Sequence, residues 1–122
     1  MRIRWKRSSA CSSASHPPSG RQRAWGGCPL GNLALEMSDI HDGFRQRIGE
    51  ILRNWRDHIS EAITRAQDQG QLARNMHSQR LADFIIAGIE GAILSARVHK
   101  DPSILDGCFD ELKRHVGMYR PD

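Results

Sequence analysis

The glycine-rich stretch WGGCPLGN, residues 25–32, contains the residue types of a phosphate-binding loop. Gly26 and Gly31 match the glycine spacing of G-x-x-x-x-G-K-[ST], in which the lysine neutralises phosphates and the hydroxyl binds Mg²⁺. Asn32 and Leu33 stand where that lysine and that hydroxyl are required, and no strand pattern precedes the loop. We therefore predict that the stretch binds no nucleotide and instead begins a helix.

Cys28, at the start of that helix, is a candidate nucleophile because helix N-termini stabilise thiolates. A thiol enzyme also needs a base within hydrogen-bond reach, and His41 is the only histidine nearby in the sequence. Burial as a small apolar residue is the commoner state of a free cysteine. We favour that state, so the chain is not predicted to be an enzyme. Its three cysteines have no metal-type spacing and suit a reducing cytoplasm.

The six histidines include no H-x-x-x-H pair of the kind that binds zinc from one helix face. The segment SDIHD gathers Asp39, His41 and Asp42, which are possible metal ligands. A polar turn between two helices explains the same residues, with Asp42 as the N-cap of the second helix. We predict the turn, and neither a metal nor another cofactor.

Apolar residues spaced three and four apart predict four helices and no strand. Pro29 suits the first position of the first helix because it lacks an N–H, and Asp101 is the expected N-cap of the last. The expected helices span residues 29–38, 42–69, 78–99 and 102–116. The predicted fold class is all-α, an antiparallel bundle of four main helices, with residues 25–118 as the domain and residues 119–122 as a frayed tail.

Residues 1–24 differ in composition, being rich in serine, proline and arginine and without periodicity, which is typical of disorder. Six of the 18 Lys and Arg residues and no acidic residue lie within residues 1–25, so residues 26–122 carry a net charge of −2. Attraction to nucleic acid is therefore expected only from this basic arm, with Trp5 and Trp25 available for stacking.

No membrane-spanning segment is expected. The longest apolar run, residues 84–98, is shorter than the roughly 20 residues that a span needs and contains Glu90 and Arg97. Residues 1–24 lack the apolar core of a signal peptide. The prediction is a cytoplasmic protein without membrane contact.

The third expected helix is apolar around most of its circumference, which indicates burial on several sides. Glu90 within it must either pair, in most cases with an arginine, or line a pocket. Where the first and second helices meet, Met37, Trp55 and Ile59 form an apolar lining, either of the core or of a ligand site. The third helix carries a row of small residues, and the first carries Gly31 and Cys28. Such small residues allow neighbouring helices to approach closely.

Three stretches, GGCPLGNLALEMSD, AQDQGQL and LADFIIAGIEGAILSARVHKDPSIL, resemble the C-terminal regulatory domain of TetR/AcrR-type transcriptional regulators. The resemblance covers residues 26–116 without a gap. In that family the last two long helices pack against their copies in a dimer, and the C-terminal helices enclose a small-molecule pocket. The resemblance therefore implies a homodimer through residues 78–99 and 102–116, and a small hydrophobic effector.

By position, the resemblance also implies two sets of site residues. The pocket set is Met37, Trp55, Ile59, Phe84 and Glu90. The dimer set is Gly88, Gly91, Ala92, Ser95, Leu105, Phe109 and Leu112.

A regulator of this family reads DNA through an N-terminal helix-turn-helix domain, and residues 1–24 lack its pattern. The expectation is an effector-binding and dimerisation domain, a truncated form without its own DNA-reading part. The alternatives are a structural partner that heterodimerises with an intact regulator, and weak nucleic-acid binding through the basic arm.

Overall fold

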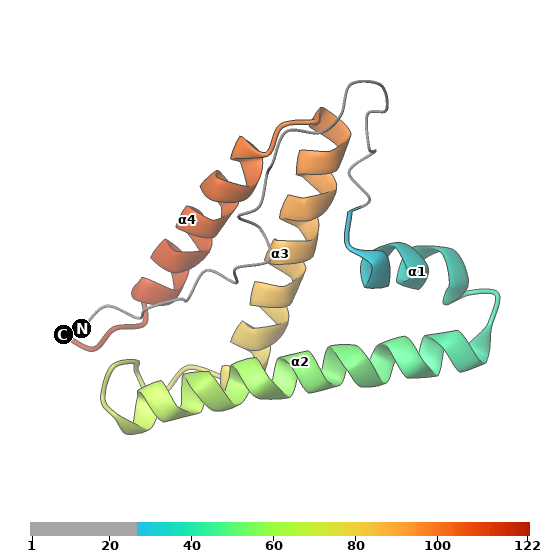
Figure 1. The fold of residues 1–122 in the computed structure, drawn as a ribbon. Coiled ribbons are helices and arrows are strands. Elements are labelled where there is room, and N and C mark those ends of the chain that lie inside the picture. Colours follow the sequence, from blue (N-terminus) through green and yellow to red (C-terminus); the bar gives the residue numbers. More distant parts are fainter. Residues whose placement is uncertain (1–26) are drawn as a thin grey trace, which may run out of the picture.

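The computed structural model describes residues 27–122, which form four α-helices joined by short loops (Figure 1). The helices are α1 (Pro29–Met37), α2 (Asp42–Asp68), α3 (Ser78–His99) and α4 (Ser103–Gly117). No strand occurs among these residues, so the predicted all-α class is confirmed. The predicted arm, residues 1–24, lies outside the described part of the chain.

Side chains just before α1, α2 and α3 fix where these helices begin. Cys28, His41 and His77 each accept the backbone N–H three residues further along, at 3.4, 3.2 and 3.5 Å. The prediction of Asp42 as the N-cap of α2 was wrong, because the ring of His41 occupies that position. Asp42 instead lies in the first turn, where a negative charge interacts favourably with the helix dipole.

The turn between α3 and α4 is held by Asp101. Its Oδ1 atom accepts both the N–H of Ser103, at 3.0 Å, and the hydroxyl of Ser103, at 2.7 Å. These two hydrogen bonds, helped by the nearby His99, favour the carboxylate and lower the pKa of Asp101 below its usual value. The helix begins at Ser103, one residue later than predicted, so the N-cap residue is Pro102 and the prediction of Asp101 at that position was wrong. Lys100 ends α3 in the left-handed conformation, with φ of 52°.

The four helices make an open arrangement rather than a closed barrel of helices (Figure 1). α1 folds back over the N-terminal half of α2, α3 stands across the C-terminal half of α2, and α4 returns alongside α3 in the opposite direction. Most contacts between helices therefore join neighbours along the chain: α1 with α2, α2 with α3, and α3 with α4.

The main core lies at the corner where α2 gives way to α3. Ile63, Leu72, Leu81 and Ala82 form its buried centre, and Val116 of α4 is among the partly buried residues packed against it. Full burial of a side chain such as Leu81 stabilises the fold by roughly 1.5–3 kcal/mol. The corner therefore fixes the relative positions of the three longest helices.

Hydrogen bonds tie the loop of residues 69–77 to the rest of the corner. Nε2 of Gln67 donates to the carbonyl groups of Ala73, at 2.9 Å, and Met76, at 3.0 Å. The N–H of Ala73 donates to the carbonyl oxygen of Tyr119, at 2.7 Å. Tyr119 was assigned to the frayed tail, but its half-buried side chain packs against the core, so the contacts of the domain extend to this residue.

Candidate functional site

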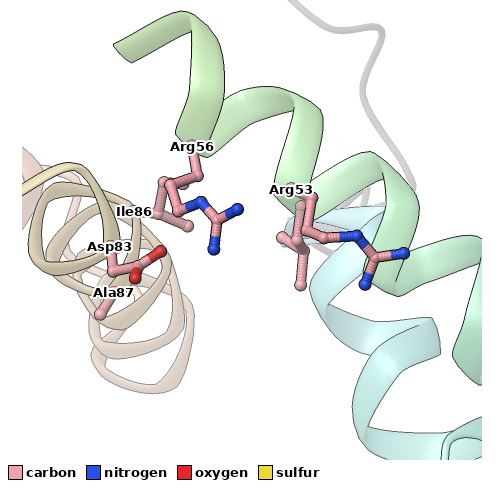
Figure 2. Close-up of a pocket in the computed structure, with 6 residues that line it drawn as sticks. Arg53, Arg56, Asp83, Ile86 and Ala87 are labelled. Atoms are coloured by element: carbon pink, nitrogen blue, oxygen red, sulfur yellow. The ribbon is translucent and has the colours of Figure 1, made fainter. Parts of the chain in front are cut away.

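A cleft between α2 and α3 has a volume of about 220 Å³ (Figure 2). Three residues of α2 line one wall and three of α3 line the other: Leu52, Arg53, Arg56, Asp83, Ile86 and Ala87. The cleft thus combines an apolar surface with charged groups of both signs, as binding sites for small organic molecules do.

The charged groups of this cleft differ in how they are paired. Nε and Nη2 of Arg56 both lie 3.3 Å from Oδ1 of Asp57, the next residue of α2. Figure 2 shows the Arg56 guanidinium extending from α2 between Asp83 and Arg53, whereas Arg53 points away from Asp83. Neither Arg53 nor Asp83 has an ion pair with another described residue. The side chain of Arg53 is exposed and therefore open to a solute.

Sequence reasoning missed this cleft. The helical period places Arg53 and Arg56 off the apolar stripe of α2, on positions that normally face water. They line a cleft because α3 crosses α2 at their level, and the crossing point of two helices is not encoded in the period of either one.

Neither this cleft nor the one between α3 and α4 is lined by all five residues of the predicted pocket. Ile59 packs against the main core, and the side chain of Trp55 is 40% exposed on α2. Met37 is half-buried at the end of α1. Phe84 contacts His115 of α4, with ring centroids 4.7 Å apart. The pocket made of these five residues stays a prediction.

Glu90 lies between α3 and α1, where its carboxylate faces Gly31. It is half-buried and forms no ion pair with a described residue, so the arginine partner considered for it is not found there. A hydrogen bond joins the same two helices, from Nη1 of Arg97 to Oδ1 of Asn32 at 3.2 Å. It connects the N-terminal end of α1 to α3.

An apolar stripe on α3 is exposed to solvent. The side chains of Phe84, Leu94 and Val98 are 48, 54 and 68% exposed. The exposed residues Ala87 and Gly91 complete a series spaced by three and four residues along one side of the helix. We call these five residues the α3 stripe. Large apolar groups aligned on one exposed helix face are typical of an interface.

The predicted dimer set is divided between this stripe and contacts within the chain. Gly88 faces Leu112 of α4, since a Cβ atom built on Gly88 would lie 2.9 Å from Cδ2 of Leu112. Ala92 is only 2% exposed, so the chain itself already covers it. Gly91, in contrast, has no atom within 4 Å of where its Cβ would stand. The rest of the set, Ser95, Leu105 and Phe109, ranges from half-buried to exposed.

A second cleft, of about 430 Å³, lies between α3 and α4. Its lining includes small residues next to larger ones: Phe84, Gly88, Gly107, Cys108, Glu111, Leu112 and His115. The α3 stripe runs between the two clefts, since Ala87 also lines the first cleft and Phe84 also lines the second.

The residues that suggested thiol or metal chemistry are not brought together. Cys28 precedes α1 and His41 follows it, and a helix of nine residues separates its two ends by about 14 Å. His41 is therefore too far from Cys28 to act as its base. Among residues 27–122 no three His, Cys, Asp or Glu side chains are grouped so as to hold a metal ion. None of the four helices is both long and apolar enough to cross a membrane.

Comparison with known proteins identifies related sequences. The family model "Tetracyclin repressor-like, C-terminal domain" matches residues 9–111. The chain is 33% identical over 89 residues to the transcriptional regulator AcuR of Cereibacter sphaeroides, covering 73% of this chain and 41% of AcuR. It is 32% identical over 80 residues to the HTH-type transcriptional repressor DhaR of Mycobacterium sp. strain GP1, covering 66% of this chain and 40% of DhaR.

A solved structure has a similar fold. A TetR-family transcriptional regulator from Cytophaga hutchinsonii superposes with a TM-score of 0.75 at 29% sequence identity, covering 80% of this chain and 48% of that protein. The chain thus spans less than half the length of each of these three relatives. The family match begins at residue 9, within the segment expected to be disordered, and residues 9–26 lie outside the described part of the chain.

Proposed function

The chain belongs to the TetR family of transcriptional regulators, of which it carries the C-terminal domain, and we propose that it serves as the dimerisation and effector-binding domain of such a regulator. The observation that carries this proposal is the α3 stripe, because a monomer would leave it exposed to water.

The stripe has the form of a helix-pairing surface. Its spacing of three and four residues is the pattern with which two helices interdigitate their side chains. Gly91 at its centre lets a facing helix approach closely, and Leu94 and Val98 supply apolar area beyond it. A second copy of α3, related by a two-fold axis, would cover the stripe with the same surface.

The second cleft extends this surface onto α4. Gly107 has no atom within 4 Å of its Cβ position, so the cleft has space for a side chain from a partner helix. Leu105 and Phe109 of α4 provide further apolar groups beside it. In the proposed dimer, α3 and α4 of each copy form a four-helix interface. Gly88 and Leu112 lie between α3 and α4 of the same chain and keep these two helices close together.

The effector would occupy the cleft between α2 and α3. Leu52, Ile86 and Ala87 offer it an apolar surface, and α2 and α3 meet the main core just beyond the cleft. A small molecule with an apolar body fits this lining.

DNA binding and location follow from the family and are part of the proposal. DhaR is named an HTH-type repressor, and the chain spans 40% of it. DNA would be read by a helix-turn-helix of the kind named in that relative, and the regulator would act in the cytoplasm, where bacterial DNA is found. Binding of nucleic acid by the basic arm stays a prediction; deletion of residues 1–24 would remove it.

The experiment for dimerisation is light scattering coupled to size-exclusion chromatography of the full chain. The expected mass is twice the 13.8 kDa of one chain. Leu94→Glu should give a monomer because a carboxylate would be buried at the interface. Leu35→Glu on α1 is the matched control, since Leu35 is 79% exposed and lies outside the stripe. A monomeric wild-type chain, or equal behaviour of the two variants, would refute the proposal.

The same stripe would also serve a heterodimer with an intact regulator. Mixing the chain with a full-length relative from the same genome distinguishes the two assemblies. Formation of mixed dimers that no longer bind DNA would favour the blocking partner, and exclusive homodimers would eliminate it.

A further inference from the structure

The lining of the cleft between α2 and α3 specifies a class of ligand beyond its apolarity. We infer that this cleft binds a small organic monocarboxylate, whose apolar tail lies against Leu52, Ile86 and Ala87 and whose carboxylate pairs with Arg53. The inference rests on the proposed effector-binding function and names the kind of molecule that the site takes.

Arg53 is the available cation of the cleft. Arg56 already donates to Asp57 through two nitrogen atoms, at 3.3 Å each, and its side chain is only 29% exposed. Arg53 has no hydrogen bond or ion pair with another described residue. Its guanidinium lies over Gly49 one turn earlier, since a Cβ on Gly49 would stand 3.3 Å from Nη1. Arg53 therefore lines the cleft with donors that no other described residue uses.

The guanidinium of Arg53 is suited to bind a carboxylate. It is planar, weakly hydrated and always charged, and its parallel N–H groups match the two oxygens of a carboxylate. Arg53 thus favours a carboxylate over a neutral group of the same shape.

Asp83 and the volume of the cleft limit the charge and the size of the ligand. Asp83 contributes a negative charge on the opposite wall and has no described ion pair, so it would repel a multiply charged anion such as phosphate. Figure 2 shows the Arg53 guanidinium turned away from Asp83, so Asp83 does not occupy the donors of Arg53. The volume of about 220 Å³ is below the 300–1,000 Å³ typical of sites for drug-sized ligands, so the ligand is small.

The test compares hexanoate with its neutral isostere hexanamide, and both with inorganic phosphate, on the full chain. Binding is followed by ¹H–¹⁵N NMR shifts of the amides of Leu52 and Ala87. Hexanoate should shift these signals in a saturable manner, and hexanamide and phosphate should bind about tenfold more weakly or not at all. Arg53→Gln should weaken hexanoate binding about tenfold and leave hexanamide binding unchanged.

Arg65→Gln is the matched control, because Arg65 lies on the same helix, is exposed and is not part of the cleft. It removes the same charge and should leave hexanoate binding as in the wild type. Equal binding of hexanoate and hexanamide would overturn the carboxylate inference while supporting an apolar effector site. Absence of binding by all probes, or equal loss in both variants, would also overturn it, and the light-scattering experiment would still decide the dimerisation function separately.

Discussion

The carboxylate of Glu90 on α3 lies directly against Gly31 on α1. A Cβ atom built on Gly31 would stand 2.5 Å from Oε2 of Glu90, closer than side-chain atoms can approach. An alanine at position 31 would therefore require the flexible end of the Glu90 side chain to move aside.

We expect Gly31→Ala to destabilise the chain by at most about 1 kcal/mol, because the added methyl group has to displace only the flexible end of the Glu90 side chain. The measurement is the free energy of unfolding in urea. In a Glu90→Ala background the same substitution should be neutral or stabilising by up to about 1 kcal/mol, since alanine has the better helix propensity. An equal destabilisation in both backgrounds would show that Glu90 is not the obstacle.

Gly88 and Gly107 line the same cleft and should respond in opposite ways to alanine. Gly88→Ala should cost about 1 kcal/mol because its Cβ would press on Leu112 at 2.9 Å, whereas Gly107→Ala should stabilise by about 0.5–1 kcal/mol because its surroundings are open. Both substitutions are made in Leu94→Glu, the variant expected to be monomeric, and compared by thermal unfolding, since association would fill the space beside Gly107 and change the apparent stability. A stabilising Gly88→Ala would mean that α3 and α4 are less closely packed than described.

Gln67 provides a test with a pH signature. Gln67→Glu keeps the shape of the side chain but replaces two N–H donors, to the carbonyls of Ala73 and Met76, by a carboxylate. We expect a loss of about 1–3 kcal/mol at pH 7, because these acceptors then face a negative charge. The carbonyls raise the pKa of the introduced glutamate in the folded state above its unfolded value of about 4.3.

The sign of this effect follows from the raised pKa. The protonated form can donate again, so part of the lost stability should return below about pH 4 and disappear as the pH rises through the folded-state pKa. Gln67→Leu is the control, since it removes the donors without adding a charge and should show no such recovery. Parallel pH profiles for the two variants would contradict the assignment of these hydrogen bonds.

Asp101 should stabilise the start of α4 only while it is ionised. Its pKa is lowered in the folded state, chiefly by the hydrogen bonds from Ser103. The contribution of Asp101 to the free energy of unfolding is therefore complete above the unfolded-state pKa near 3.8. This contribution is lost as the pH falls through the lower folded-state pKa. The difference in Tm between wild type and Asp101→Ala should therefore be constant from pH 5 to 7 and shrink below about pH 4. A difference independent of pH down to 2 would argue against ionic capping.

The helices themselves were predictable from the sequence to within a residue or two at each end. α1 was expected at residues 29–38 and is found at Pro29–Met37, because Pro29 and the apolar spacing define it without help from other elements. The N-cap of α2 was assigned to Asp42 and proved to be His41. Both types of side chain can accept the N–H, and the backbone path of the preceding turn decides which of them reaches it.

The candidate site was less predictable, because it depends on how helices cross. Phe84 and Ile59 were expected to face one pocket, but Phe84 turns toward His115 of α4 and Ile59 toward the main core. When a helix is apolar around most of its circumference, the sequence pattern does not show which neighbouring helix each residue faces. Leu94 and Val98 were part of the same apolar pattern, and only the position of α4 shows that they remain uncovered.

The pairing of each helix mainly with its neighbour along the chain has a kinetic consequence. Contacts between residues close in sequence form quickly, and all-helical domains of this kind fold within microseconds to milliseconds. Pairing of two chains is a second-order step and slows in proportion to dilution. If the α3 stripe pairs as proposed, the time between folding and assembly is set by how much of the protein a cell makes.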